Sequence, residues 1–552
     1  MRSFVLCLVA LLCAAFCLNA QESRATISGL VTDSSGAAVP DAQVSAINLE
    51  TGLTVKSQAN GQGLYVIPYL LPGQYKIQVE RTGFKSFDQS PIVLRVADRV
   101  EINAVLQVGQ MTERISVVAD AALVETETSS RGQVIDNQRI NDLPSNGRNP
   151  LQFVGLTPGV QFAGSSQTYF RPFDTQLDFT INGGQRGVNE IQIDGVPDNA
   201  ITYYTAQPQF AYTPPSEATQ EFKVQTNTYD AQYGRTSGGV INLSIKSGTN
   251  KPHGAVYEYL RRTSLTANTY ANNANRQVRP NRIQDQYGFE LDGPVHLPKL
   301  YNGRDRTFFM VAFEKYRDNQ PQPGLGSVPT QEQRNGDYSQ TLQANGKPYI
   351  IYDPLTIKLN PAFDPAKTVA LTNLQYLRVA FPGNQVPANR FNPSALAVLK
   401  DIPLPNQTGD ATTHLNNWFA GDASSATDYY NGIVRVDHNI NDRMRFFARW
   451  DRNFRDGGRK NAYSWNTNAK QYTYSGRNND GAVADLVDTL NPHTVLSFRL
   501  GFNRYVYSSI YNYQDLSYLG IPVTSQLQTP GKYPLISFTN YITTSVEDND
   551  FS

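Results

Sequence analysis

The sequence predicts a mainly β protein with three structural parts: a small β-sandwich, a compact α+β domain, and strands of a large antiparallel β-barrel that spans a membrane. Three observations predict this class. A chain of 552 residues is too long for one ordinary core. Its 31 Tyr, 26 Phe and 40 Gly favour strands over helices. Several segments alternate apolar and polar residues with the period of two that strands require.

Residues 1–20 are typical of a secretory signal peptide. Arg2 precedes an apolar run from Phe4 to Leu18, and the small residue Ala20 precedes Gln21. The run is shorter than the ~20 apolar residues that a membrane helix needs, so we expect export and cleavage between Ala20 and Gln21. A retained anchor is the alternative. All the cysteines lie in this segment, at Cys7, Cys13 and Cys17. The exported chain would therefore contain no disulfide.

Residues 24–107 predict a β-sandwich. The expected strands are "ATISGLVTD", "AQVSAINLE", "LTVKSQ", "GLYVIPYL", "QYKIQVER" and "VEINAVLQV". Turn-forming stretches such as "SSGAAVPD", "NGQG" and "LPG" separate them. In "QYKIQVE", Tyr75, Ile77 and Val79 alternate with polar residues, which predicts one buried face.

The order "ISGLVTDSSGAAVPDAQV…NGQGLYVIPYLLPGQYKIQVERTGF" resembles the carboxypeptidase regulatory-like domain. The resemblance implies a transthyretin-like or carbohydrate-binding-like sandwich. We find no clustered aromatic residues that would form a platform for sugar, so a spacer or docking module is favoured over a sugar-binding module. The fold alone does not establish either function.

Residues 108–125 read as a linker that contains one apolar strip. "ERISVVAD" has no evident strand partner of its own, and an acidic segment rich in Ser and Thr follows it. Residues 126–250 then predict a compact α+β domain, because "EIQIDGVP" and "GVINLSIKSG" alternate between glycines as half-buried strands do. The glycines of "INGGQRG" indicate tight turns, since no Lys-Ser/Thr pair or periodic helix follows them as in a phosphate-binding loop.

Three segments of this domain, "INDLPSNGRNPLQFVGLTPGV", "DFTINGGQRGVNEIQIDGVP" and "EFKVQTNTYDAQYGRTSGGVINLSIKSGTN", carry a second resemblance. They resemble, in this order, the plug domain of TonB-dependent outer-membrane receptors. With the sandwich in front of it, the chain is similar to the Oar-like subgroup. The resemblance implies an α+β plug inside a barrel.

Residues 251–552 contain about seven segments that suit membrane strands. In "RMRFFARWD", one face carries Met444, Phe446, Ala448 and Trp450, and the other carries Arg443, Arg445, Phe447, Arg449 and Asp451. In "VLSFRLGFN", Leu496, Phe498, Leu500 and Phe502 alternate with Ser497, Arg499, Gly501 and Asn503. One face therefore suits lipid and the other a polar lumen.

A soluble sandwich also has alternating strands, and three further observations favour the barrel. Charged residues gather on single faces, the connection from Asp318 to Thr427 has the length of an extracellular loop, and a plug needs a container. Plugged barrels have ~22 strands. Because only about seven are visible and no final aromatic strand precedes "EDNDFS", we expect a fragment of a longer barrel.

The resemblance also implies a mechanism: TonB pulls on a segment that precedes the plug, and an extended strip is gripped by β-augmentation. The TonB-box candidate comprises Glu113, Arg114, Ile115, Ser116, Val117, Val118 and Ala119. The alternative is that this strip is the last strand of the sandwich or the first strand of the plug.

Other function classes find little support in the residues. Balanced charge, with 48 Lys plus Arg and 48 Asp plus Glu, gives no sign of a nucleic-acid partner. The five histidines lack zinc-peptidase spacing, and no G-x-S-x-G elbow or Rossmann fingerprint occurs. We therefore predict no enzyme and no catalytic, cofactor-binding or metal-binding residues.

Two function classes remain. One is a transporter of the outer membrane, whose partners are TonB, membrane lipid and an unidentified ligand such as an oligosaccharide or another large nutrient. The other is a surface binding protein or adhesin that uses the sandwich to hold carbohydrate or protein.

Overall fold

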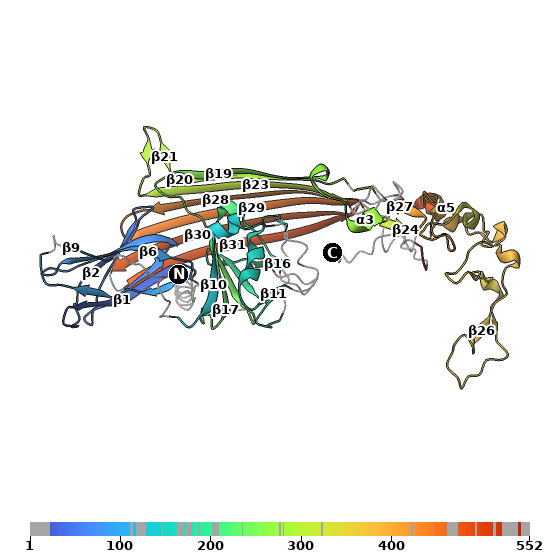
Figure 1. Cartoon of the computed structure of the whole chain (residues 1–552), viewed down its shortest axis with the longest axis horizontal. Coiled ribbons are helices and arrows are strands. Elements are labelled where there is room, and N and C mark those ends of the chain that lie inside the picture. The colour runs from blue at the N-terminus through green and yellow to red at the C-terminus, as the bar shows by residue number, and fades with distance from the viewer. Residues whose placement is uncertain are drawn as a thin grey trace, which may run out of the picture.

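A computed structural model places three parts along one extended sheet (Figure 1). The structure describes residues 22–110, 114–117, 128–145, 147–162, 171–172, 179–185, 188–200, 209–234, 236–274, 278–279, 281–321, 324–420, 424–460, 473–491, 494–511, 515–521 and 539–541. The predicted signal peptide, with Ala20 and Gln21, lies outside these residues. So do Glu113, Val118 and Ala119 of the TonB-box candidate.

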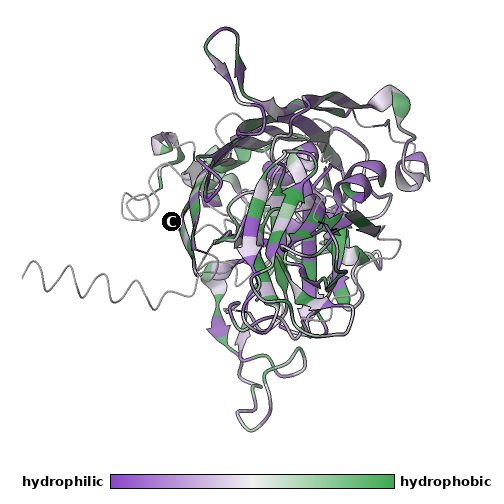
Figure 2. Cartoon of the chain, turned by 90° about the vertical axis from the view of Figure 1, so that its left-hand side faces the viewer, coloured by the Kyte–Doolittle hydropathy of each residue, from purple (hydrophilic) through white to green (hydrophobic). Residues whose placement is uncertain are grey.

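The N-terminal part is a sandwich of two sheets. The first has the order β4 (Leu64–Leu70), β1 (Ala25–Asp33), β7 (Arg99–Glu101), and β8 (Ala104–Leu106) also pairs with β1. The second has the order β3 (Thr54–Gln58), β2 (Gln43–Asn48), β5 (Gly73–Glu80), β6 (Ser86–Leu94), β9 (Arg114–Val117). Viewed along the wall from this end, the sandwich stands in front of the other parts, and its strands alternate hydrophobic and hydrophilic residues (Figure 2).

The alternation in β5 is confirmed, because Tyr75, Ile77 and Val79 are all buried in the sandwich core. The single strand expected at "VEINAVLQV" is divided into β7 and β8. Strand β6 was not predicted, because Ser86, Phe87 and Asp88 are buried in succession and the period of two is lost. Asp88 is buried beside Lys76, whose Nζ lies 2.7 Å from its carboxylate.

The central part is an α+β domain, hereafter the central domain. Its main sheet has the order β10 (Arg131–Asp136), β17 (Thr219–Asn227), β18 (Val240–Ile245), β13 (Glu190–Ile193), β14 (Val196–Pro197). Strands β13 and β18 are parallel, and the other pairs are antiparallel. Smaller elements are α2 (Asn137–Asp142), the 3-10 turns η1 (Pro150–Leu156) and η3 (Ser216–Ala218), and the pairs β11 (Val160–Phe162) with β12 (Phe179–Ile181) and β15 (Asn199–Ala200) with β16 (Gln209–Phe210).

Local chemistry explains where the helical elements of this domain begin. The Asp136 side chain accepts a hydrogen bond from the Arg139 N–H and caps α2. The Asn149 side chain accepts one from the Leu151 N–H, and Pro150 follows as the first residue of η1. Ile140 of α2 and Val154 of η1 are buried in the core of the domain.

The C-terminal part is a curved antiparallel wall of seven strands, as predicted. Its order is β19 (His253–Arg262), β20 (Ile283–Pro294), β23 (Thr307–Pro321), β28 (Ser424–Asn439), β29 (Met444–Lys460), β30 (Thr473–Asn491), β31 (Thr494–Tyr511). These described strands form an open wall and not a closed barrel. The turn between β28 and β29 is short, and the Asn441 side chain accepts hydrogen bonds from the N–H groups of Arg443 and Met444.

The two faces of the wall differ as the alternation predicts. Trp450 on β29 and Phe498 and Leu500 on β31 are 49%, 62% and 64% exposed. Arg449 and Asp451, on the opposite face of β29, are buried. No helix within the described ranges is both long and apolar enough to cross a membrane.

The long connection between β23 and β28 lies beyond the end of the wall opposite the sandwich (Figure 1). Its elements are β24 (Gly324–Gly326), α4 (Gln331–Arg334), η5 (Pro354–Thr356), β25 (Lys358–Leu359), β26 (Tyr376–Leu377), η6 (Pro382–Asn384), η7 (Ala388–Arg390), α5 (Pro393–Asp401) and β27 (Trp418–Ala420). It shares a small apolar core with η8 (Ser517–Leu519), in which Val328, Val398 and Leu519 are buried. The remaining elements are η4 (Thr263–Leu265), α3 (Tyr270–Ala274), β21 (His296–Leu297) and β22 (Tyr301–Asn302).

Candidate functional site between the central domain and the wall

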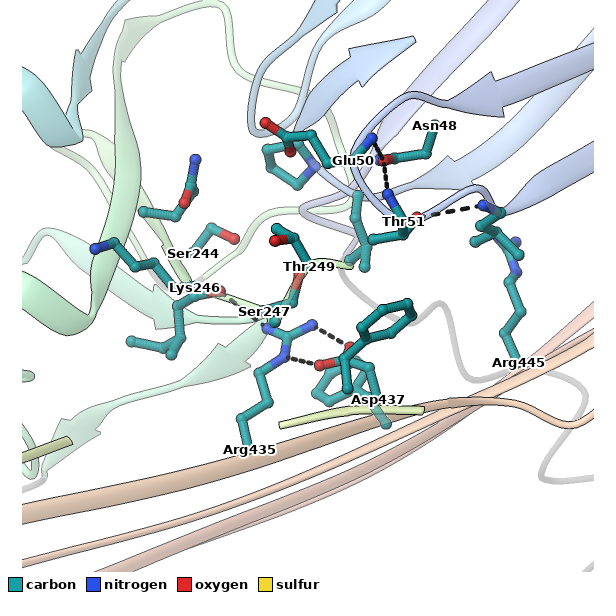
Figure 3. A pocket seen from close by; sticks show the side chains of 18 of the residues that line it. Asn48, Glu50, Thr51, Ser244, Lys246, Ser247, Thr249, Arg435, Asp437 and Arg445 are labelled. Atoms are coloured by element: carbon teal, nitrogen blue, oxygen red, sulfur yellow. Dashed lines mark hydrogen bonds and ion pairs between the residues drawn. The ribbon is translucent and has the colours of Figure 1, made fainter. Parts of the chain in front are cut away.

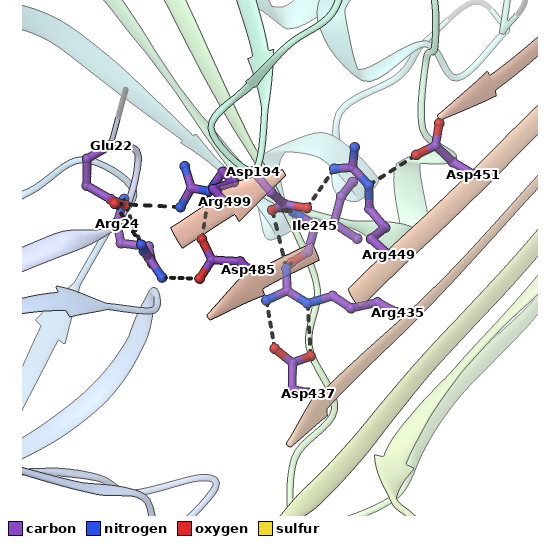
Figure 4. A network of polar contacts seen from close by, with 10 residues as sticks. All are labelled: Glu22, Arg24, Asp194, Ile245, Arg435, Asp437, Arg449, Asp451, Asp485 and Arg499. Atoms are coloured by element: carbon purple, nitrogen blue, oxygen red, sulfur yellow. Dashed lines mark hydrogen bonds and ion pairs between the residues drawn. The ribbon is translucent and has the colours of Figure 1, made fainter. Parts of the chain in front are cut away.

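Asp194 is the charged centre of the contact between the central domain and the wall (Figure 4). It follows β13 in the turn "IDGVP", where Asp194 has a positive φ of 50° and the next residue, Gly195, a φ of 76°. Its carboxylate accepts a hydrogen bond from Arg449 Nη1 at 2.7 Å and one from Arg435 Nη1 at 3.3 Å. The Ile245 N–H donates to the same carboxylate at 3.0 Å, so a backbone bond also orients it.

Both arginines reach Asp194 from the inner face of the wall. Arg435 on β28 and Arg449 on β29 are 1% and 3% exposed. Each is also paired along its own strand: Arg435 with Asp437 at 2.8 Å and Arg449 with Asp451 at 3.1 Å. Charges buried this completely are tolerated only when they are paired and hydrogen-bonded. Asp194 is therefore the group of the central domain that completes the pairing of two wall cations.

Arg449 and Asp451 lie on one face of β29, as the alternation predicts, and this face meets the central domain. The alternation does not single out Arg435, Asp437 or Asp194. The signal for the first two was present in "IVRVDHN", where a basic and an acidic residue are two positions apart on one strand face. The role of Asp194 was not visible, because its partners lie more than 200 positions away.

A second charged cluster joins the start of the sandwich to the wall. Arg24 Nη1 lies 2.7 Å from Asp485 on β30, and Arg499 Nε on β31 lies 2.8 Å from the same carboxylate. Glu22 contacts both arginines, at 2.7 and 3.6 Å. Burial alone would raise the pKa of Glu22, but the charges of Arg24 and Arg499 lower it to about 2.

The sandwich also contacts the central domain directly. Lys223 Nζ on β17 lies 3.2 Å from Asp98, and the Val96 N–H donates a hydrogen bond to the Glu221 carboxylate. Burial raises the pKa of Glu221 to about 7. Arg99 and Asp230 form a more exposed pair at 2.9 Å.

A third charged contact lies on the far flank of the wall. Arg148 of the central domain pairs with Glu217 at 2.9 Å and donates to the Tyr259 hydroxyl on β19 at 2.6 Å. Its guanidinium lies over the rings of Tyr257 and Tyr259, 5.2 and 4.5 Å from their centroids. The central domain is thus held at β19 on one side and at β28 to β31 on the other, where Asn479 of β30 and Asn503 of β31 also donate hydrogen bonds to its backbone.

Apolar side chains complete the contact. Met310, Ala312 and Ile433 of the wall belong to the same buried cluster as the core of the central domain. Val196 of β14 is buried with Phe447 and Val483 of the wall. A domain packed this closely on one face of a sheet, while the other face is apolar and exposed, occupies the inside of a barrel wall.

A cavity of about 330 Å³ lies where the sandwich, the central domain and the wall meet (Figure 3). The sandwich turn at Thr51, the chain after β18 at Lys246 and Thr249, and Arg445 of the wall line it. Among the described residues, no group of three or more His, Cys, Asp or Glu side chains could hold a metal ion.

The structure corrects one expectation for the TonB-box candidate. Arg114–Val117 is not a strand without a partner: it forms β9 and pairs in parallel with β6 at the edge of the second sandwich sheet. This position is the one that the alternative interpretation, the last strand of the sandwich, requires. The pairing was hidden in the sequence because its partner β6 shows no regular alternation.

A two-faced wall of antiparallel strands with a domain packed on its polar face is the arrangement of part of a plugged outer-membrane β-barrel. Residues 244–551 match the family model described as "Outer membrane beta barrel domain", which is more than half of the chain. Residues 26–107 match the "Carboxypeptidase regulatory-like domain", and residues 124–240 match the "TonB-dependent Receptor Plug Domain". The chain therefore belongs to the outer-membrane β-barrel family, in the branch that carries a TonB-dependent receptor plug.

Two curated relatives are similar to parts of the chain. The TonB-dependent transporter Oar of Myxococcus xanthus is 27% identical over 297 residues, which cover 50% of this chain and 26% of that protein. The probable TonB-dependent siderophore receptor PirA of Acinetobacter baumannii is 28% identical over 187 residues, which cover 32% of this chain and 22% of that protein. The matched part thus spans about a quarter of the length of each relative.

Solved structures give more distant similarity. The outer membrane transporter YddB from Escherichia coli aligns at 12% identity with a TM-score of 0.39, covering 67% of this chain and 38% of that one. The ferric citrate transporter FecA in its unliganded form aligns at 11% identity with a TM-score of 0.32, covering 70% and 51%.

Proposed function

We propose that this protein is a TonB-dependent outer-membrane transporter, in which the central domain plugs the barrel until TonB pulls on the chain before it. The observation that carries the proposal is the two-faced wall. Its outer face presents Trp450, Phe498 and Leu500, while its inner face pairs Arg435 and Arg449 with Asp194 of the plug. A wall with these faces suits lipid outside and a stopper inside.

The sheet order of the plug suits a pull from its N-terminal side. Strand β10, the first strand after the linker, lies at one edge of the main sheet. The turn that holds Asp194 joins β13 and β14 at the other edge. Tension on the linker therefore acts first on β10, whose one neighbour among the described strands is β17. The plug can open from this edge while the Asp194 contacts still hold the opposite edge to the wall.

The segment Glu113 to Ala119 is the TonB box of this proposal. In the sequence it lies between β8 of the sandwich and β10 of the plug, and Ile115 and Val117 have the β propensity that strand addition favours. The outer membrane holds no ATP, so the energy has to arrive as a mechanical pull.

The test removes the segment from the full-length gene product. We expect deletion of residues 113–119 to abolish binding of a purified periplasmic TonB fragment. Deletion of residues 120–125, a piece of the same linker outside the TonB box, is the matched control and leaves binding in place. Equal binding by both deletion variants would reject the TonB box.

The long connection between β23 and β28 is the proposed ligand-facing side. It lies at the end of the wall opposite the sandwich, which has to face the periplasm if TonB is to reach β9 (Figure 1). It contains a cavity of about 700 Å³ lined mainly by apolar and aromatic side chains, among them Tyr338, Tyr349 and Phe391. Such cavities are typical ligand sites. An oligosaccharide or another large nutrient is the ligand class that we propose.

The same orientation separates a transporter from an adhesin that uses its sandwich. Beyond residue 17 the sequence contains no cysteine, so single cysteines can be introduced as labels. On intact cells, we expect an impermeant maleimide to label Leu371→Cys in the long connection, which is 92% exposed. We expect no labelling of Val108→Cys in the sandwich, which is 76% exposed. The reverse result would favour the adhesin.

A further inference from the structure

We propose that the sandwich is an internal docking partner for the TonB box: its β6 edge holds Arg114–Val117 as an added strand, and TonB loads the plug only after this strand is released. The inference rests on the proposed function and concerns when the TonB box is available. It gives the N-terminal domain a regulatory role beyond that of a spacer.

The backbone pairing is continuous over the whole strand. The register partners are Ser86 with Arg114, Phe87 with Ile115, Asp88 with Ser116, and Gln89 with Val117. Before β9 begins, the chain already runs beside the start of β6. The Lys85 N–H donates to the Gln107 carbonyl at 2.8 Å, and the Gly109 N–H donates to the Gly83 carbonyl at 3.1 Å. Little chain entropy is lost in docking a strand that starts so close to an existing contact.

Docking also uses the apolar side chain that gives the strip its β propensity. Ile115 is half-buried beside Phe87, which is 6% exposed and belongs to the sandwich core. Ser116, the next residue, is exposed. The strip therefore follows the pattern of a sandwich edge strand, with its apolar residue toward the core.

The anchoring of the sandwich makes release necessary. The sandwich is tied to the wall through Arg24 and Asp485 at 2.7 Å, and to the plug through Asp98 and Lys223 at 3.2 Å. While β9 stays paired with β6, a pull on it is borne by these contacts. Tension reaches β10 of the plug only when β9 has left β6.

The linker between β9 and β10 is long enough for a released TonB box to move away from the sandwich. Thirteen residues separate Val117 from Arg131, where β10 begins. A chain of this length, fully extended, reaches about 45 Å. The released TonB box can therefore meet TonB well away from the barrel mouth, whereas the docked one is held against the sandwich.

A reversible disulfide tests the inference in the full-length protein. Gln89→Cys with Val117→Cys places the two cysteines at register partners of neighbouring parallel strands. Gln89→Cys with Ser116→Cys is the matched control, because it places the two thiols on opposite faces. We expect the disulfide to form in the first variant and not in the second.

The readout is binding of the purified periplasmic TonB fragment. We expect the oxidised Gln89→Cys, Val117→Cys protein to bind at least tenfold more weakly than the same protein after reduction. Binding by the reduced form shows that the variant is folded. Oxidation of the control variant is expected to leave its binding unchanged.

The other outcomes separate this inference from the proposed function. If no disulfide forms while the unmodified protein binds TonB, docking is rejected and the transporter proposal stands. If the disulfide forms and TonB binds the oxidised protein equally well, the docked strand does not regulate access and the inference is overturned. If the unmodified protein does not bind TonB, the TonB box itself is rejected, and β9 is only the last strand of the sandwich.

Discussion

The Asp194 turn and strand β9 are two attachments of opposite character. Asp194 holds the plug to the wall with two arginines that are 1% and 3% exposed. Strand β9 is four residues long and has a single neighbour in the described sheet. A buried, doubly paired carboxylate is costly to remove, whereas a short edge strand is held by a few backbone hydrogen bonds. The comparison predicts that the Asp194 contact is the stronger attachment and that β9 is the one more easily released.

The largest expected effect comes from Asp194→Ala. It leaves Arg435 and Arg449 buried with one carboxylate partner fewer each, which costs about 3 to 5 kcal/mol when a buried pair is broken. We expect the plug to become sensitive to protease at denaturant concentrations that leave the wall intact. The control is Asp230→Ala, which removes a largely exposed pair with Arg99 and costs below about 1 kcal/mol. Equal protease sensitivity of the two variants would contradict the strong attachment of the plug to the wall at Asp194.

The contact through Glu221 is expected to be weaker than the Asp194 contact and stronger than the pairing of β9, and it depends on pH. The pKa of Glu221 is raised to about 7 by burial, so the folded state favours the neutral acid. The stabilisation that protonated Glu221 gives the folded state is fully present below the ordinary pKa of 4.5 and is lost as pH rises through 7. The free energy of unfolding then falls by about 3 kcal/mol. We expect the amides near Val96 to exchange faster at pH 8 than at pH 5, relative to the intrinsic rates. Glu221→Gln is expected to remove this pH dependence, and an unchanged profile would show that another group is responsible.

Gly195→Ala is expected to weaken the attachment of the plug to the wall less than Asp194→Ala does. Gly195 has a φ of 76°, and a Cβ there would overlap the Arg499 guanidinium. We expect a loss of about 2 to 3 kcal/mol from backbone strain and displacement of Arg499. Gly183→Ala is the matched control, because its φ is 73° and a Cβ there would have no atom within 4 Å. The difference between the two unfolding free energies isolates the contact with Arg499, and equal losses would show that the backbone alone matters.

The smallest expected effect is at β9. Ile115→Thr keeps β propensity and loses part of the packing beside Phe87, which costs about 1 kcal/mol. We expect protection of amides 114–117 from hydrogen exchange to fall roughly fivefold. Ser116→Thr, at the exposed neighbour, is the control. Unchanged protection in both variants would mean that β9 is held by its backbone alone.

The sequence predicted the parts of the structure that have local periodicity. The two faces of β29 and β31 follow from alternation at Met444 to Asp451 and Leu496 to Asn503, because a strand turns successive side chains to opposite sides. The buried face of β5 follows in the same way. Strand β6 escaped prediction because its packing interrupts the alternation, and the partner of β9 escaped with it.

By itself, the sequence determined which strand faces are apolar, where turns interrupt the chain, and the order of sandwich, plug and wall. Only the tertiary structure decided that Asp194 meets Arg435 and Arg449, that residues 22–24 are tied to β30 and β31, and that Arg114–Val117 docks on β6. The physical reason is the distance in sequence between the residues that interact. Backbone geometry couples residues a few positions apart, whereas ion pairs and sheet edges join residues that only folding brings together.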